Sequence, residues 1–203
     1  LESYETGNAM DPIESIQSDR AQARRLSDPN SDLCFLALAD LDCNASVRTL
    51  VLREIAKDHV TLFINKTSPK WHVIAKGGDA ELLIWYPSVQ RQYRVRGPIE
   101  EMDNALIQEN WQRRPPGSKY LDHVYDQLGP QSSSIPDRKT LTHKITELKS
   151  TSADDLEAPP SATGVFMRYR TIDVLDLNQE DRIHDRSLFT FDGNSWQSQV
   201  KIP

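Results

Sequence analysis

The stretch Val47-Arg48-Thr49-Leu50-Val51-Leu52-Arg53 has the composition of a β-strand, because five of its seven residues are apolar or β-branched. Such a composition is typical of a strand that is buried on both faces. Arg48 and Arg53 are five positions apart, so they point to opposite faces of an extended strand. A guanidinium is rarely buried without a partner, and phosphate is the anion that its fork fits best, so we expect an anionic ligand here. The alternative interpretation is that both arginines reach water or nearby carboxylates.

The composition is that of a globular protein and excludes several classes of function. The 203 residues suit one domain, and 27% of them are charged and 37% hydrophobic. The net charge of −6 argues against a general nucleic-acid or membrane-surface binder, since these rely on basic residues. We see no apolar run of roughly 20 residues and no signal-peptide pattern. Cys34 and Cys43 are therefore interpreted as reduced thiols of a cytoplasmic protein, and residues 1–9 as an added segment outside the fold.

Short apolar segments separated by turn residues predict a mostly β protein with inserted helices. The predicted strands are residues 33–39, 47–53, 60–64, 81–86, 90–100 (with a break at Gly97-Pro98), 165–169, 172–177, 187–191 and 196–202. The first three are expected to form an antiparallel meander. Helices are expected after Asp11-Pro12, from Pro69 to Lys76 with Ser68 as the cap, and over 103–149, followed by a mobile linker at 150–163. The pattern indicates a single domain over residues 10–203, an antiparallel barrel with a helical insertion.

Two groups of polar residues before and within the predicted helical insertion suit a ligand. Lys70 lies in the first turn of the short predicted helix, where backbone N–H groups favour an anion. Arg114-Pro115-Pro116-Gly117-Ser118 places an arginine and a hydroxyl around a bend, as in a phosphate cradle. A solvated lysine and an ordinary turn are the alternative interpretations.

Two further groups lie on predicted strands or next to them. Gln92 has both a donor and an acceptor for the edge of a heterocycle. Arg182, His184 and Arg186 share one face if the chain is extended there, which gives two fixed cations and one titratable ring. Surface charge is the alternative for this cluster. The histidines show no metal-ligand spacing, and no carboxylate pair, Gly-rich phosphate loop or nucleophile motif is visible.

Taken in order, these groups resemble the motifs of the pyridoxamine 5′-phosphate oxidase family, FMN enzymes with a split β-barrel fold that work as homodimers. The similarity runs from about Leu33 to Pro203. It rests on Arg48–Arg53, Asn65 to Lys70, Arg91-Gln92 after Trp85-Tyr86-Pro87, Arg114-Pro115 with Ser118, Gln131-Ser132, Arg182–Arg186, and the ending Trp196 to Pro203. The Arg182–Arg186 cluster is the most specific of these motifs. The resemblance implies an antiparallel split β-barrel of the FMN-binding type, assembled as a homodimer.

The resemblance also implies a role for each group. FMN would be bound by Arg48, Thr49, Leu50, Val51, Leu52, Phe63, Ile64, Lys70, Gln92 and Arg186, and by Gln131 and Ser132 from the partner subunit. The substrate would meet Arg53, and its phosphate would meet Arg114 and Ser118. Arg182 and His184 would lie against the substrate ring as the catalytic pair, with His184 able to relay a proton near neutral pH.

Five departures from the family pattern touch FMN or substrate positions. Arg53 stands where the family has a lysine, Pro69-Lys70 where it has Arg-Lys, and Asn110 where it has a tyrosine. Asp176 stands for a tryptophan, and Ala162-Thr163-Gly164-Val165 for a Trp-Gly-Gly stretch. We therefore expect FMN binding to survive these changes better than vitamin B6 specificity.

The leading hypothesis is an FMN-dependent oxidase of a small, ring-containing substrate, with or without a phosphate, in which dioxygen reoxidises the flavin. Pyridoxamine or pyridoxine 5′-phosphate is the default substrate. One alternative is an oxidase of a different ring, such as a phenazine precursor. The other is a non-catalytic barrel that binds FMN or pyridoxal phosphate. Neither a nucleic acid nor a membrane is expected as a partner.

Overall fold

The computed structural model describes residues 11–151 and 156–203 of the chain. Residues 1–9, interpreted above as an added segment, and residues 152–155 of the predicted linker lie outside this part. The described residues form two compact units, the first made of 11–62, 78–99 and 167–203 and the second of the remainder. Strands β4 (His59–Asn65), β6 (Arg91–Glu101) and β7 (Ala162–Arg168) each run from one unit into the other.

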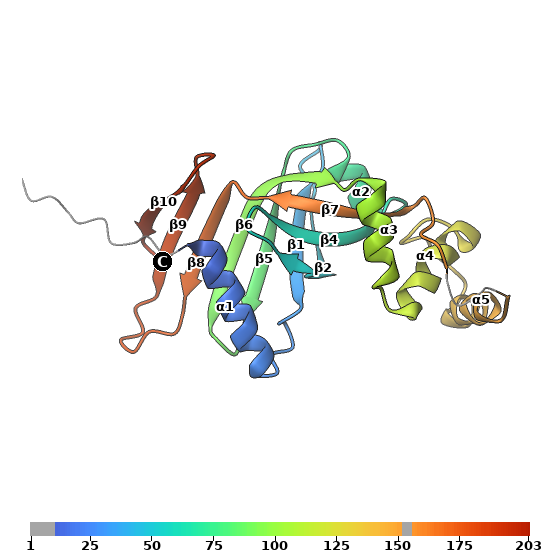
Figure 1. The fold of residues 1–203 in the computed structure, drawn as a ribbon, viewed down its shortest axis with the longest axis horizontal. Helices are drawn as coiled ribbons and strands as arrows, with labels where there is room; N and C mark the ends of the chain where they lie inside the picture. Colours follow the sequence, from blue (N-terminus) through green and yellow to red (C-terminus); the bar gives the residue numbers. More distant parts are fainter. Residues whose placement is uncertain (1–10, 152–155) are drawn as a thin grey trace, which may run out of the picture. The chain divides into compact units, whose positions relative to one another are not determined.

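The first unit is built on an antiparallel sheet with the strand order β10-β9-β8-β6-β5-β1-β2 (Figure 1). Its other strands are β1 (Leu33–Ala39), β2 (Ala45–Val51), β3 (Glu54–Ile55), β5 (Asp79–Tyr86), β8 (Thr171–Asp176), β9 (Asp185–Phe191) and β10 (Trp196–Lys201). Burial alternates along β5 and β6, as expected for strands with one face on a core. The buried face supplies core residues from several strands, including Leu36, Leu82, Ile84, Tyr93, Val95 and Ile172. The opposite face carries polar side chains such as Glu81 and Arg94 together with half-buried apolar ones such as Leu83 and Trp85.

The strand around Arg48 is β2, and the prediction that it is buried on both faces is wrong. Within the described sheet, β2 stands at the end of the strand order and pairs with β1, with Leu33 opposite Val51. Val47 is 68% exposed. The predicted meander is confirmed for its first pair, because β1 and β2 are antiparallel neighbours, and wrong for its third strand, because β4 pairs with β3 and β7. The second neighbour of β1 is β5. Apolar composition reports the preference for a pleated backbone and does not identify the neighbouring strands.

Strand β6 passes through Gly97-Pro98 without the predicted break. Pro98 lies opposite Asp79 in register with β5. A Cβ atom on Gly97 would lie 2.0 Å from the carbonyl oxygen of Arg168. Glycine is therefore needed here because two backbone segments approach closely, and only a residue without a side chain leaves room for this.

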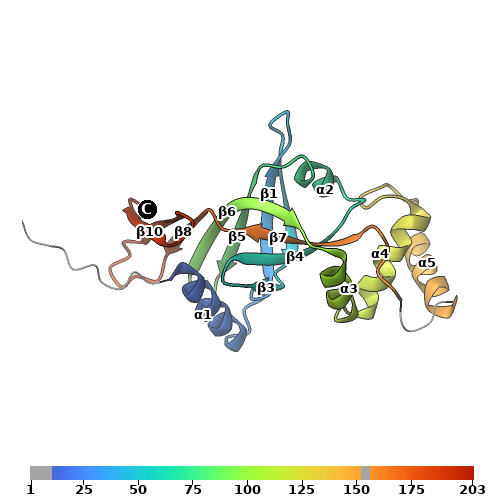
Figure 2. The same cartoon turned by 45° about the horizontal axis from the view of Figure 1, so that its top comes forward.

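Helix α1 (Pro12–Arg25) packs against β3 and β5 of the first unit (Figures 1 and 2). The side chain of Asp11 caps it, and Ile16 on the inward face is fully buried. Arg20 is buried too, and its guanidinium donates to the carbonyl oxygen of Leu52 and to the carboxylate of Asp32. A charged residue is thus accommodated in the core because the chain supplies its acceptors.

The second unit holds the helices α2 (Pro69–Ile74), α3 (Asn104–Gln112), α4 (Pro116–Leu128) and α5 (Arg138–Thr151). Trp111 on α3 is 1% exposed and is the largest fully buried side chain among the residues that the structure describes. Ser68 precedes α2 as predicted, but its hydroxyl donates to the carbonyl oxygen of Asn65 and does not cap the helix. No helix in the described part of the chain is long and apolar enough to cross a membrane.

Candidate functional site

Lys70 and Gln131, two of the predicted FMN contacts, lie side by side in the second unit. Lys70 Nζ donates to Gln131 Oε1 at 2.9 Å, although the residues are 61 positions apart. The backbone N–H of Gln131 donates to the Thr67 hydroxyl at 3.0 Å, and its side-chain amide donates to the Tyr125 hydroxyl at 3.3 Å. The structure therefore groups Gln131 with Lys70 of its own chain, whereas the resemblance implied that Gln131 acts on a cofactor held by the partner.

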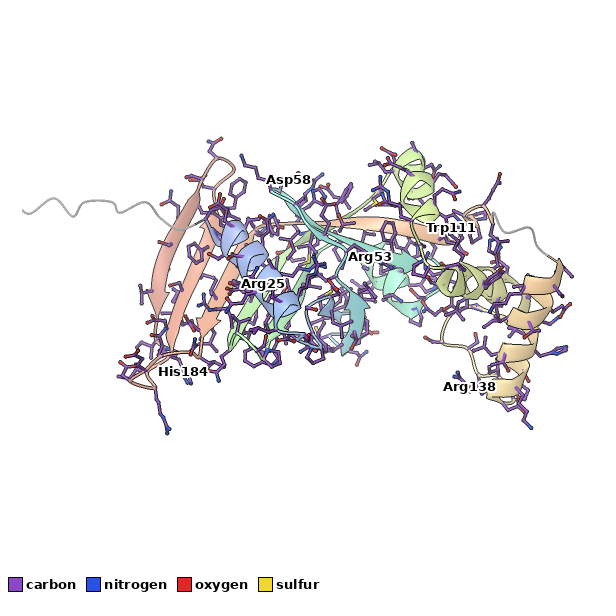
Figure 3. All side chains as sticks on the ribbon, turned by 60° about the horizontal axis from the view of Figure 1, so that its bottom comes forward. Arg25, Arg53, Asp58, Trp111, Arg138 and His184 are labelled. Atoms are coloured by element: carbon purple, nitrogen blue, oxygen red, sulfur yellow. The ribbon has the colours of Figure 1, made fainter. Side chains whose placement is uncertain are left out.

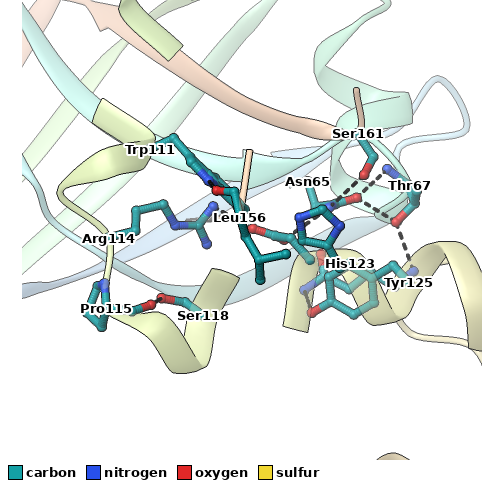
Figure 4. A network of polar contacts seen from close by, with 12 residues as sticks. Asn65, Thr67, Trp111, Arg114, Pro115, Ser118, His123, Tyr125, Leu156 and Ser161 are labelled. Carbon is teal, nitrogen blue, oxygen red and sulfur yellow. Dashed lines mark hydrogen bonds and ion pairs between the residues drawn. The ribbon is translucent and has the colours of Figure 1, made fainter. Parts of the chain in front are cut away.

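Asn65 fixes the loop that carries this cluster (Figure 4). It is 3% exposed, and its side-chain oxygen accepts from the backbone N–H of Thr67 at 2.9 Å and from the Thr67 hydroxyl at 2.6 Å. Its side-chain nitrogen donates to Asp122 Oδ1 at 3.0 Å and to the Ser161 hydroxyl at 3.3 Å. One buried amide thus connects the β4–α2 loop, helix α4 and the segment before β7.

Arg114, predicted to meet a substrate phosphate, forms an ion pair with Asp122 on helix α4. The two side chains are 14% and 7% exposed. The Arg114 guanidinium also stacks over the ring of Trp111, 4.9 Å from its centroid (Figure 4). The Ser118 hydroxyl donates to the carbonyl oxygen of Pro115 at 2.9 Å. The predicted cradle is thus present as a turn, but its cation already has an anionic partner within the chain.

The face of the first unit's sheet opposite its core carries Gln92 and Arg186. Asp173 lies at the centre of this face and accepts from Arg94 Nη2 at 2.7 Å and from Arg186 Nη2 at 2.8 Å. Burial raises the pKa of Asp173, but hydrogen bonding from Arg186 and the charges of both arginines outweigh it, so the net pKa is lowered. A groove of about 700 Å³ crosses this face, lined among others by Glu81, Arg94, Arg186, Leu188 and Lys201. Such a groove is large enough for a cofactor ring.

Arg48 and Arg53 do not flank one strand as predicted, because β2 ends at Val51. Arg48 is half-buried and donates to the carbonyl oxygens of Leu36 at 3.3 Å and Ser46 at 3.2 Å. Burial lowers the pKa of the Arg48 guanidinium. Arg53 is exposed beyond the strand (Figure 3).

The remaining backbone contacts that the resemblance assigns to FMN lie on two strands. Thr49, Leu50 and Val51 are paired with β1. Leu52 follows them and already uses its N–H on the carbonyl oxygen of Asp32. Phe63 and Ile64 lie on β4 in the second unit.

Arg182 and His184 lie in the exposed loop between β8 and β9. Figure 3 shows His184 there. The expectation that they share a face with Arg186 on an extended chain is wrong, because Arg182 has a φ of +61° and only Asp185 onward is a strand. The carboxylate of Asp181 accepts the N–H of Ile183 at 2.9 Å and bends the loop. Their roles toward a substrate stay predictions.

Two of the changed or predicted positions have local partners of their own. Asp176 forms an ion pair with Arg91 at 2.6 Å, so its negative charge is balanced within the sheet. Asn110 donates to the carbonyl oxygen of Leu106 in its own helix. Ser132 is exposed with a φ of +79°, a left-handed conformation that costs energy for a residue other than glycine.

The sequence did not single out Thr67, Asp122 or Asp173, although each contacts a predicted site residue. Asp122 and Asp173 are buried carboxylates, but nothing in their sequence neighbourhoods distinguishes them from the many exposed ones. Thr67 lies inside the Asn65 to Lys70 motif and could have been included with it. Among residues 11–151 and 156–203, no group of three or more His, Cys, Asp or Glu side chains is arranged to hold a metal ion.

Comparison with curated proteins finds relatives over most of the chain. The chain is 30% identical over 196 residues to the pyridoxine/pyridoxamine 5′-phosphate oxidase of Deinococcus deserti, covering 95% of this chain and 89% of that protein. The chain belongs to the pyridoxine/pyridoxamine 5′-phosphate oxidase family. The protein of the same name from Polynucleobacter asymbioticus is 28% identical over 186 residues, covering 92% and 85% of the two chains. No family model matches the sequence.

Comparison with solved structures shows the fold of this member of the pyridoxine/pyridoxamine 5′-phosphate oxidase family. PhzG from Burkholderia lata, in complex with tetrahydrophenazine-1-carboxylic acid, superposes with a TM-score of 0.84 at 22% identity, covering 100% of this chain and 98% of PhzG. A pyridoxamine 5′-phosphate oxidase-related, FMN-binding protein from Nostoc punctiforme gives 0.77 at 19% identity, covering 95% and 98%. The predicted family and the predicted antiparallel split β-barrel with helices are therefore confirmed.

Proposed function

We propose that this chain is an FMN-dependent oxidase of a small, unsaturated or partly reduced ring compound. FMN, when bound, would supply the redox chemistry, a two-electron oxidation in which the hydride and the proton lost by the substrate end up on dioxygen as hydrogen peroxide. The protein binds and orients both partners. The proposal extends to this chain what the names of its relatives state, and it is supported by the two groups of polar residues described above.

The observation that carries the proposal is the meeting of Lys70 and Gln131 at 2.9 Å. The family resemblance assigned each of them to FMN on separate motifs. A cation beside an amide that has both donors and an acceptor suits a phosphate and the hydroxyl groups next to it. Asn65 and Thr67 hold the loop and the Gln131 backbone in place, so this end of the cofactor site is built before FMN arrives.

The outer face of the first unit's sheet, considered by itself, carries polar side chains that suit a planar ring. Gln92 and Arg186 supply hydrogen-bond donors there, and Asp173 holds the Arg186 fork in one orientation. Val200 and Ile202, near the groove, are 85% and 92% exposed. Apolar groups beside a polar groove are typical of a protein interface, and we propose that a second copy of the chain covers this face in a homodimer.

The test of the cofactor proposal is the affinity for FMN, measured by quenching of flavin fluorescence. Lys70→Ala removes one charge-assisted hydrogen bond, worth roughly 1.5–3 kcal/mol, so we expect the Kd to rise about 10- to 100-fold. Lys76→Ala removes the same charge just after α2 and should change the Kd less than about threefold. A wild-type protein that takes up no FMN refutes the proposal. Equal effects of the two substitutions refute the role of Lys70.

A specific observation favours a second candidate, a barrel that binds FMN without oxidising vitamin B6. Arg114 is engaged by Asp122, and Arg182 and His184 lie in an exposed loop. A peroxide-coupled assay on the FMN-loaded protein separates the candidates: peroxide formed from pyridoxamine 5′-phosphate supports the oxidase of vitamin B6. Peroxide formed from partly reduced phenazine carboxylic acids supports an oxidase of another ring, and a yellow protein inert toward both supports the binding barrel.

A further inference from the structure

Arg114 is the only arginine of the predicted substrate turn, and its guanidinium is held from two sides. Arg114 Nη1 donates a hydrogen bond to Asp122 Oδ2, while Asp122 Oδ1 accepts from Asn65 Nδ2 at 3.0 Å. The Trp111 ring lies against the guanidinium, 4.9 Å from its centroid. Arg114 Nε is buried and has no acceptor among the described residues. The position of the guanidinium is therefore set by Asp122 and Trp111.

The carboxylate of Asp122 takes the place that an incoming anion would occupy. It is 7% exposed, so water screens its charge poorly, and it cannot swing away without breaking one of the two hydrogen bonds that the buried Asn65 side-chain nitrogen donates. A phosphate at Arg114 would share one guanidinium with a second negative group in a poorly hydrated site. Like charges at such distances oppose each other strongly.

We infer that Asp122 is a specificity-determining residue that selects against phosphorylated substrates, so the ring compound oxidised by this chain carries no phosphate at this end. The inference rests on the proposed function, since it concerns the substrate end of that same site. Asp122 neutralises Arg114 and leaves the turn from Pro115 to Ser118 able to offer neutral hydrogen-bonding groups only. The chain thus retains the arginine of the family's phosphate site, but this arginine is not available to a substrate phosphate.

The test compares the binding of pyridoxine and pyridoxine 5′-phosphate to the FMN-loaded protein by equilibrium dialysis. We expect the unaltered protein to bind pyridoxine 5′-phosphate about tenfold more weakly than pyridoxine, because the Asp122 carboxylate opposes the phosphate. Asp122→Asn keeps the size of the side chain and removes its charge, and should tighten binding of the phosphate ester about 10- to 100-fold, the equivalent of one charge-assisted bond. Binding of pyridoxine should change less than threefold. The double variant Arg114→Ala, Asp122→Asn should lose the gain.

A second measurement does not depend on the ring. Inorganic phosphate at millimolar concentration should raise the melting temperature of FMN-loaded Asp122→Asn and leave the unaltered protein and the double variant unchanged. A tenfold preference of the unaltered protein for the ester, or an Asp122→Asn variant that responds to neither phosphate ligand, overturns the inference while FMN uptake still supports the proposed function. Failure of the unaltered protein to take up FMN instead refutes the proposed function, and the inference with it.

Discussion

Replacement of Gly97 by alanine should destabilise the first unit by about 1–3 kcal/mol. The added Cβ would lie 2.0 Å from the Arg168 carbonyl oxygen and 3.2 Å from the Arg170 backbone nitrogen. The oxygen must therefore move by about 1 Å to reach a tolerable contact, which is overpacking that costs about 1–3 kcal/mol. The same shift strains the hydrogen bond from the Arg170 N–H to the Arg96 carbonyl oxygen, worth about 1 kcal/mol. Removing a glycine from a strand returns up to about 1 kcal/mol.

Thermal and urea unfolding of the purified protein measure this loss. For a chain of this size, 1 kcal/mol corresponds to about 2–4 °C, so we expect the melting temperature to fall by about 2–12 °C. Gly117→Ala is the control, because a Cβ on Gly117 would meet no atom within 4 Å, and we expect no loss there. A Gly97→Ala protein as stable as the control would refute the close approach of β6 and the Arg168–Arg170 backbone.

Three further predictions concern charge, assembly and the exposed loop. The pKa of Asp173 is lower in the folded protein than in the unfolded chain, so its ionised form contributes stability that is present above about pH 4 and is lost as the pH falls through the folded pKa. In urea unfolding, the difference in stability between the wild type and Asp173→Asn should therefore shrink from about pH 5 to about pH 3. Light scattering at micromolar concentration should give a mass of about 46 kDa, twice the 23.1 kDa chain, and a monomer that retains FMN would contradict the homodimer. His184→Ala should lower kcat with the active substrate by about 100-fold and leave the Kd for FMN within threefold, whereas an unchanged kcat would remove His184 from the mechanism.

Local composition predicted the elements of the fold well and their neighbours poorly. Strand β1 was predicted at its observed bounds, since Leu33 to Ala39 is apolar and flanked by polar turns. Gly97-Pro98 was predicted to be a break, because the sequence cannot show a backbone that approaches from Arg168, 71 positions further along. The prediction that β2 is buried on both faces failed for a similar reason, since an edge strand and a central strand can have the same residues.

In the candidate site too, the sequence could name single residues but not the contacts between them. Lys70 and Gln131 could be named from their motifs, but only the fold shows that they touch in one chain. Asp122 carried no signal, because its importance comes entirely from Arg114 and Asn65, which other segments bring to it. The Arg182–Arg186 pattern predicted the wrong backbone shape, since a turn from Asp181 overrides the alternation, and its role toward a substrate stays a prediction.

The pairing of β6 with β8 has a consequence for how the chain is made. Arg96 lies opposite Thr171, and all the helices of the second unit after α2 are encoded between these two neighbours. At typical rates of synthesis, the ribosome needs roughly 4–15 s to cover the intervening residues. During that time, one side of β6 presents unpaired N–H and C=O groups, as any sheet edge does. The nascent protein must therefore pass through an interval in which a central strand behaves as an edge, and a slow translation step between α3 and β7 would lengthen its exposure to aggregation.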